Sequence, residues 1–166
     1  MIQVSYVALE DGTKAVDGSS SIYAGQPVSI NASGKIVPAT SGSKIFGLAK
    51  VDRNSYEDSV VGKYSIYGSG LMPVLCMGIA SIKASTYNTI EVTNAVTSSA
   101  FSKDIFDTSK TYAPGDLLYV DANGLISNVA GASKVSALGR VLKVGADELE
   151  IEVNPSIITA ASELAA

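Results

Sequence analysis

Few side chains in this sequence could do chemistry, because its 166 residues include no histidine. Histidine is the most common general base and a frequent metal ligand, so a Ser-His-Asp or Cys-His site is impossible here. Gly68-Ser69-Gly70 lacks the spacing of a Gly-x-Ser-x-Gly nucleophile elbow. Glu57 stands where a phosphate-binding loop ending in Gly62-Lys63 would need its first glycine. We therefore expect no catalytic residue, no cofactor-binding residue and no enzyme activity.

Acidic residues are the next candidates for a binding site. Residues 148–153 alternate glutamate with leucine, isoleucine and valine, so a strand here would carry Glu148, Glu150 and Glu152 on one face. The simplest interpretation is a solvated sheet face, and the alternative is a cation site or a groove for a basic partner. Asp121-Ala-Asn-Gly124 is similar to part of a calcium loop, but the other EF-hand positions are missing. We interpret it as a turn and expect no metal ligand.

Three other features have structural interpretations. Cys76 is the single cysteine and lies between Leu75 and Met77, which predicts a packed apolar thiol and excludes an intramolecular disulfide. Asn31-Ala-Ser33 matches the N-glycosylation pattern, but we expect it to form a turn. The eight tyrosines are expected to be half-buried sheet residues, with interface anchors as the alternative.

The elements that must position these residues are predicted to be short strands. From Tyr112 to Val153 the sequence alternates apolar segments with turn residues, which is typical of a β-meander. Asn123-Gly124 predicts a type I′ hairpin turn, in which both central residues have positive φ. Residues 135–144 and 148–153 are predicted to be the last two strands, and Asn154-Pro155 should end the last one.

The same pattern occurs earlier, so that 24–50 and 114–142 are candidate repeat cores. At a constant spacing, the matched pairs are Gly25 and Gly115, Asn31 and Asp121, Ala32 and Ala122, Gly34 and Gly124, and Lys44 and Lys134. We expect Gly25, Gly34, Asn123 and Gly124 to be structural turn residues, with Gly34 and Gly124 at positive φ. The alternative is chance similarity between two hairpins rich in glycine and serine. A real repeat would mean two similar β-lobes in a single domain of residues 1–166.

The remaining segments mostly favour strands as well. Ile2 to Leu9 alternates Ile2, Val4 and Tyr6 with polar residues and should be a strand. Residues 71–82 are almost continuously apolar and predict a buried strand pair, kinked at Gly78, at the centre of the core. Further strands are expected at 44–51, 64–67 and 89–92. A helical turn is plausible only within 97–112. Residues 156–166 could be a helical turn, a docked arm or a frayed end. The predicted fold is all-β, a small barrel or sandwich built from two similar meanders with little helix.

Composition narrows the possible partners. A net charge of −4, with twelve scattered basic residues, argues against nucleic-acid binding. No apolar run approaches the roughly 20 residues that span a bilayer, and no secretory signal follows Met1, so we expect no membrane partner and synthesis in the cytoplasm. The charged fraction of 17% is low for a soluble monomer, which suggests that a partner covers some apolar surface.

The repeated pattern resembles the small β-rich head-decoration, or capsid cement, proteins of tailed bacteriophages. It consists of a glycine and a polar residue, alternating apolar residues, an Asx-x-x-Gly turn, an apolar pair, a small-residue loop and an apolar-Gly-apolar-Ala ending. Residues 25–49 carry it, and residues 115–141 carry it with Arg140 and Val141 departing from the usual ending.

The resemblance implies a structural virion protein that binds the outer surface of an assembled phage capsid and bridges its subunits. It also implies the major capsid protein as partner, a homo-oligomer with a trimer favoured, and a place on the capsid surface after assembly in the host cytoplasm. The alternatives are another virion module, such as a tail tube or fibre base, or a carbohydrate-binding or adhesive β-domain. Ile2, Val4 and Tyr6 are the predicted partner-contacting residues, because a terminal strand can be lent to a neighbouring chain. The alternative for this strand is that it closes its own sheet.

Overall fold

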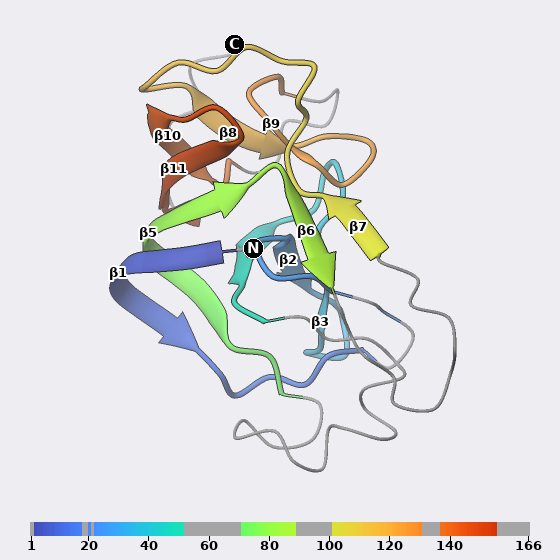
Figure 1. The fold of residues 1–166 in the computed structure, drawn as a ribbon. Helices are drawn as coiled ribbons and strands as arrows, with labels where there is room; N and C mark the ends of the chain where they lie inside the picture. Colours follow the sequence, from blue (N-terminus) through green and yellow to red (C-terminus); the bar gives the residue numbers. More distant parts are fainter. Residues whose placement is uncertain are drawn as a thin grey trace, which may run out of the picture.

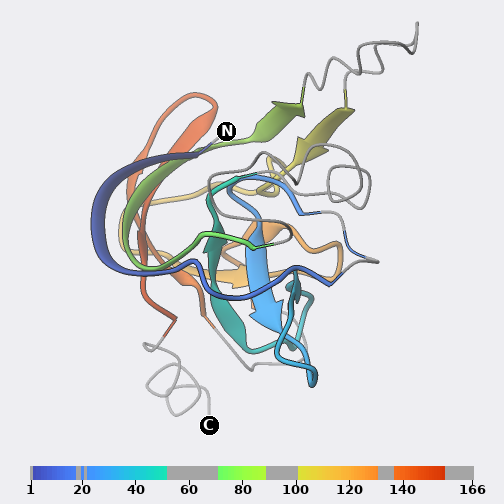
Figure 2. The ribbon, with the colours of Figure 1, turned by 90° about the horizontal axis from the view of Figure 1, so that it is seen from below.

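The protein is all-β, as the sequence predicts, with one curled antiparallel sheet that forms a half-barrel (Figures 1 and 2). The computed structural model describes residues 2–17, 20, 22–51, 71–88, 101–130 and 137–155, which contain strands and no α-helix. The strands are β1 (Ile2–Asp11), β2 (Pro27–Ile30), β3 (Ile36–Pro38), β4 (Ile45–Ala49), β5 (Val74–Lys83), β6 (Ser85–Asn88), β7 (Phe101–Asp104), β8 (Leu117–Val120), β9 (Ile126–Ser127), β10 (Gly139–Val144) and β11 (Glu148–Val153). The main sheet has the order β3-β2-β4-β5-β11-β10-β8-β9, with β1 paired to β5, while β6 and β7 form a separate ribbon.

The centre of the sheet is β5, a single strand and not the strand pair predicted for 71–82. On one edge β5 pairs with β1 along its length, and on the other it pairs first with β4 and then with β11. Gly78 does not break the strand. Its missing side chain lets β1 approach, since a Cβ there would lie 2.2 Å from the Tyr6 carbonyl oxygen. The strand is buried on both faces only from Val74 to Cys76; beyond them Ala80 and Ile82 are buried, whereas Met77 on the other face is exposed.

The meanders β2-β3-β4 and β8-β9-β10 are built alike, since β2 pairs with β3 and β4, and β8 pairs with β9 and β10. In the first meander the Gly25 N–H bonds to the carbonyl of Ala49 in β4, and in the second the Gly115 N–H bonds to the carbonyl of Val141 in β10, both at 2.8 Å. The likeness also covers the residues before each meander. Ile36 N–H bonds to Ala15 O and Ile126 N–H bonds to Ile105 O, both at 2.8 Å. The two units therefore have the same strand order and the same glycine hydrogen bond, and in each the segment before the meander forms a parallel bridge to its second strand, Val16 with Ile36 and Phe106 with Ile126.

The hairpin turns differ from the predicted type I′. Gly124 N–H bonds to Asp121 O at 3.1 Å, which puts Ala122 and Asn123 at the centre of the turn and Gly124 after it, at φ +78°. This is the three-residue connection in which a turn is followed by a left-handed glycine. The Asp121 carboxylate decides the geometry, because its Oδ1 accepts the N–H groups of Asn123 and Leu125, both at 2.8 Å. Asn123 thus forms part of the turn without serving as its left-handed residue.

The first meander turns in the same way. Asn31 Oδ1 accepts the N–H groups of Ser33 and Lys35 at 3.0 Å, and Gly34 has φ +74°. The predicted positive φ at Gly34 and Gly124 is confirmed, and Gly25 also has positive φ, at +90°. A short polar side chain at the first turn position is therefore the common signal of both hairpins.

The core consists of two clusters of buried side chains. The larger one joins β4 and β5 to the second meander and to β11, and the smaller one lies between the first meander and the start of β5, with Met72, Val74 and Cys76 among its members. Residues at matching positions of the two meanders are buried alike. Val28 matches Leu118 and Ile36 matches Ile126, and all four side chains are at most 1% exposed. Burial of apolar side chains on this scale is the main source of stability for the sheet.

The prediction of a helical turn within 97–112 is wrong for residues 101–112, the part of that segment that the structure describes. Residues 101–104 form β7, which pairs with β6, and Ile105 and Phe106 follow as buried core residues. Pairing with a strand distant in sequence overrides the weak helical spacing of the aromatic residues. The strands predicted at 64–67 and 89–92 and the tail 156–166 lie outside the described residues.

Candidate interaction surface

No metal centre is formed by the described residues, in which no group of three or more histidine, cysteine, aspartate or glutamate side chains could hold an ion. Cys76 is buried in the smaller core cluster, and this burial raises the pKa of its thiol. A protonated, enclosed thiol is a poor nucleophile. In the same described residues, no helix is long and apolar enough to cross a membrane.

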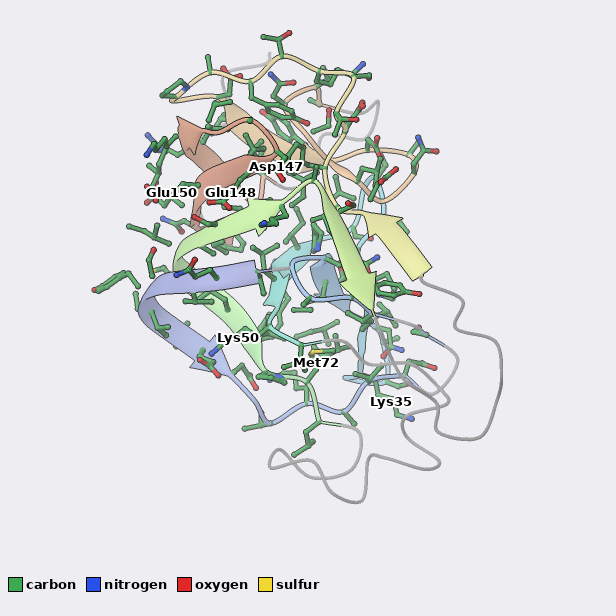
Figure 3. The ribbon with its side chains drawn as sticks, in the orientation of Figure 1. Lys35, Lys50, Met72, Asp147, Glu148 and Glu150 are labelled. Carbon is green, nitrogen blue, oxygen red and sulfur yellow. The ribbon has the colours of Figure 1, made fainter. Side chains whose placement is uncertain are left out.

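The acidic stripe on β11 is a charge-balanced sheet face. Leu149, Ile151 and Val153 are at most 1% exposed, as the alternation predicts, while the glutamates that alternate with them lie on the outer face (Figure 3 labels Glu148 and Glu150). Each glutamate has a basic residue opposite it on a neighbouring strand. The pairs are Glu148 with Lys83, Glu150 with Lys143, and Glu152 with Arg140, the last joined Nε to Oε2 at 3.1 Å. This arrangement fits a solvated face.

Asn31 has its side chain engaged within the first meander. Its Nδ2 donates to Asp17 Oδ2 at 2.9 Å while its Oδ1 accepts two backbone N–H groups. The corresponding positions in the second meander hold Asp107 and Asp121. The sequon residue therefore serves the turn, as the sequence analysis expects.

The most open apolar surface of the described part lies on β1. Ile2 and Val4 are half-buried and pack against the larger core cluster, whereas Tyr6, Val7 and Leu9 are 59%, 45% and 56% exposed. Among the described strands, β1 pairs only with β5, so its other edge has no partner there. The structure thus separates the three residues that sequence alternation put on one face: Ile2 and Val4 point inward and Tyr6 points outward.

An irregularity in the pairing of β1 with β5, between Val4 and Tyr6, causes this separation, and two more follow, between Val7 and Leu9 and between Leu9 and Glu10. Each of the first two leaves one residue of β1 without a partner on β5, which shifts the alternation of side chains by one. Tyr6 consequently lies opposite Ile79, and Leu9 lies opposite Met77.

Tyr6, Leu9, Met77 and Ile79 form an apolar band on the outer face of the sheet, called here the β1–β5 strip. Met77 is 36% exposed and Ile79 is partly exposed. The strip lies next to the acidic stripe, since Ile79 is also opposite Glu152 on β11. Sequence alternation misses the strip because the first two irregularities in β1 decide which residues reach it.

Ion pairs hold the far end of β1. Glu10 pairs with Lys50 and Asp11 pairs with Lys14, and Thr13 donates to Asp11 Oδ1 at 2.8 Å from both its N–H and its hydroxyl (Figure 3 labels Lys50). The hydrogen bonds from Lys14 and from the Thr13 N–H lower the pKa of Asp11 to about 2. Glu10 and Asp11 are therefore both paired with lysines of the same chain. The rest of the strand, Ile2–Leu9, contains no charged residue.

No protein-family model matches the sequence, and no curated protein is significantly similar to it.

Proposed function

We propose that this protein is a structural virion protein that binds the outer surface of an assembled phage capsid and stabilises it by bridging capsid subunits. The observation that carries the proposal is the β1–β5 strip with its uncharged strand, an exposed apolar surface on a protein with no metal-binding cluster in its described residues. The decoration-protein pattern of the two meanders supports it further. The partner would be the major capsid protein, and the protein would act as a homo-oligomer and not as an enzyme.

The stabilisation follows from mass action. A protein that binds only the assembled shell stabilises it by RT ln(1 + [L]/Kd) per site, about 2.7 kcal/mol when its free concentration is one hundred times Kd. Fully burying a large apolar side chain contributes roughly 1.5–3 kcal/mol, so covering the half-exposed Tyr6, Val7 and Leu9 would supply a few kcal/mol per copy. Repetition over many sites turns such modest contacts into a large effect on the shell.

Binding to heads tests the proposal. If the coding sequence next to this one encodes a major capsid protein, heads assembled from that protein alone should bind the purified chain in a saturable way. The chain should sediment with the heads at micromolar concentration and raise the temperature at which they break open. Heads that neither bind the folded protein nor gain thermal resistance would refute the proposal, and unassembled capsid protein is the control for binding to the shell itself.

A further inference from the structure

The turn between β8 and β9 contains the single Asn-Gly pair of the sequence, Asn123-Gly124 (Figure 1). In deamidation, the backbone nitrogen of the next residue attacks the amide carbon of an asparagine side chain. Glycine is the most reactive next residue, because it has no Cβ to hinder the approach. The first meander has Ser33-Gly34 at the corresponding place and so has no amide to lose there. The two hairpins therefore turn alike and differ in this chemistry.

The Asn123 side chain is accessible for this reaction. Asn123 is exposed, and its side chain forms no hydrogen bond with the described residues. The space around the glycine is open as well. A Cβ on Gly124 would have one atom outside the adjacent residues within 4 Å, the Ala39 carbonyl oxygen at 3.6 Å. Access of water to the amide therefore does not limit the reaction.

The attacking nitrogen, in contrast, is held by the turn. The Gly124 N–H donates to Asp121 O at 3.1 Å, and this bond must break before the nitrogen can lose its proton and reach the side chain. The Asp121 carboxylate holds the residues on either side, because its Oδ1 accepts the N–H groups of Asn123 and Leu125 at 2.8 Å. Hydrogen bonds to an ionised group are about twice as strong as neutral ones, so Asp121 keeps the turn closed.

We propose that Asn123 is a deamidation site whose rate is set by the opening of the turn that Asp121 holds closed. In the open turn, the Gly124 nitrogen gives its proton to water and bonds to Cγ of Asn123. The bond between Cγ and Nδ2 then breaks, and Nδ2 leaves as ammonia after taking up a proton. Water adds to one of the two carbonyl carbons of the resulting cyclic imide, which leaves aspartate or isoaspartate at this position.

The isoaspartate product disrupts the hairpin more than the aspartate product. Aspartate leaves the main chain unchanged and adds one negative charge near Asp121. Isoaspartate takes the main chain through the side-chain carbon, which lengthens the link between residue 123 and Gly124 and changes the spacing of the N–H groups that Asp121 binds. This strains the pairing of Val120 with Ile126, two buried residues that face each other across the turn. The isoaspartate form should therefore melt at a lower temperature than the aspartate form.

Mass spectrometry of the purified folded chain, kept at mildly alkaline pH well below its melting temperature, tests the site. The peptide that contains residue 123 should gain about 1 Da, the difference between the water taken up and the ammonia lost. The gain should be much slower than in the same chain kept in denaturant. Asn123→Ser is the matched control, because it puts the residue of the first meander at this place and should abolish the gain.

Two substitutions of Asp121 test the role of the turn. Asp121→Ala removes both carboxylate bonds and should speed the modification about tenfold or more, because the loss of one hydrogen bond to a charged group already favours opening by roughly that factor. Asp121→Asn keeps a side-chain oxygen, as Asn31 does in the first meander, and should leave the rate within a few-fold of the wild type. Circular dichroism of each variant checks that the fold is retained.

Hydrogen exchange measures the opening without any substitution. In the wild type, the protection of the Gly124 amide against exchange should match, within a few-fold, the factor by which folding slows the modification, because both need the same opening. This comparison decides if Asp121→Ala does not fold.

The inference is overturned by equal rates in the folded and the denatured wild type, or by a folded chain that stays unmodified at residue 123 while the Gly124 amide exchanges freely. Equal rates in folded Asp121→Ala and Asp121→Asn would also overturn it. None of these measurements uses capsids, so the outcome is independent of the proposed function.

Discussion

Replacing Gly139 with alanine should strongly destabilise the protein, because the backbones of β10 and β11 meet at this residue. A Cβ on Gly139 would lie 1.7 Å from the carbonyl oxygen of Glu152, 2.8 Å from the carbonyl carbon, and 3.2 Å from the Asn154 nitrogen. All three atoms belong to the backbone, so no side chain can rotate away to relieve the contact. The two strands would have to separate locally, at the point where Gly139 pairs with Val153.

The expected cost lies at the upper end of the range for overpacking, about 3 kcal/mol, since the clash falls on paired backbone and not on a flexible side chain. For a chain of this size, each 1 kcal/mol corresponds to about 2–4 °C in Tm, so the melting temperature should fall by roughly 6–12 °C. Gly47→Ala should behave similarly, because a Cβ there would lie 2.3 Å from the Leu75 carbonyl oxygen. Gly47 occupies the corresponding place in the first meander.

Urea unfolding followed by circular dichroism, together with thermal melts, measures both variants at one protein concentration. Gly12→Ala is the control, because a Cβ at Gly12 has no atom within 4 Å, and this change should be neutral or stabilise by up to about 1 kcal/mol. Unfolding midpoints for Gly139→Ala and Gly47→Ala that match that of Gly12→Ala would refute the close approach of the strands at both positions.

Three further predictions concern turns, a buried hydroxyl and pH. Gly34→Val or Gly124→Val should each lower the free energy of unfolding by about 1–2 kcal/mol, because both glycines have positive φ; melting temperatures equal to the wild type would contradict this. Ser29→Ala should leave stability unchanged or raise it by about 1 kcal/mol, since the Ser29 hydroxyl is buried without a hydrogen-bond partner, and a clear loss in urea unfolding would show that the hydroxyl is satisfied. The pKa of Asp11 is lowered from 3.8 to about 2, so its contribution to stability is present above pH 3.8 and is lost as pH falls through 2. Asp11→Asn should therefore flatten the dependence of Tm on pH over that interval, and an unchanged pH profile would argue against the Lys14 interaction.

The local features of the fold could be predicted from the sequence. Alternation in 148–153 correctly predicts which side chains of β11 face the core, because neighbouring residues of a strand point to opposite faces wherever the strand lies. Positive φ at Gly34 and Gly124 is also correctly predicted, since the Asx-x-x-Gly pattern determines it within a few residues. The all-β class follows from the same kind of evidence, repeated along the chain.

Only the tertiary structure decides which strands meet and in what register. The apolar run in 71–82 looks the same whether it forms two strands or one, and the single strand β5 arises because β1, β4 and β11 cover its edges. The outward position of Tyr6 depends on the register of β1 against β5, where an unmatched residue reverses the alternation that Ile2 and Val4 begin. Strand periodicity is a property of adjacent residues, whereas pairing is set by contacts between residues that lie far apart in the chain, and the exposed strip on β1 and β5 results from that pairing.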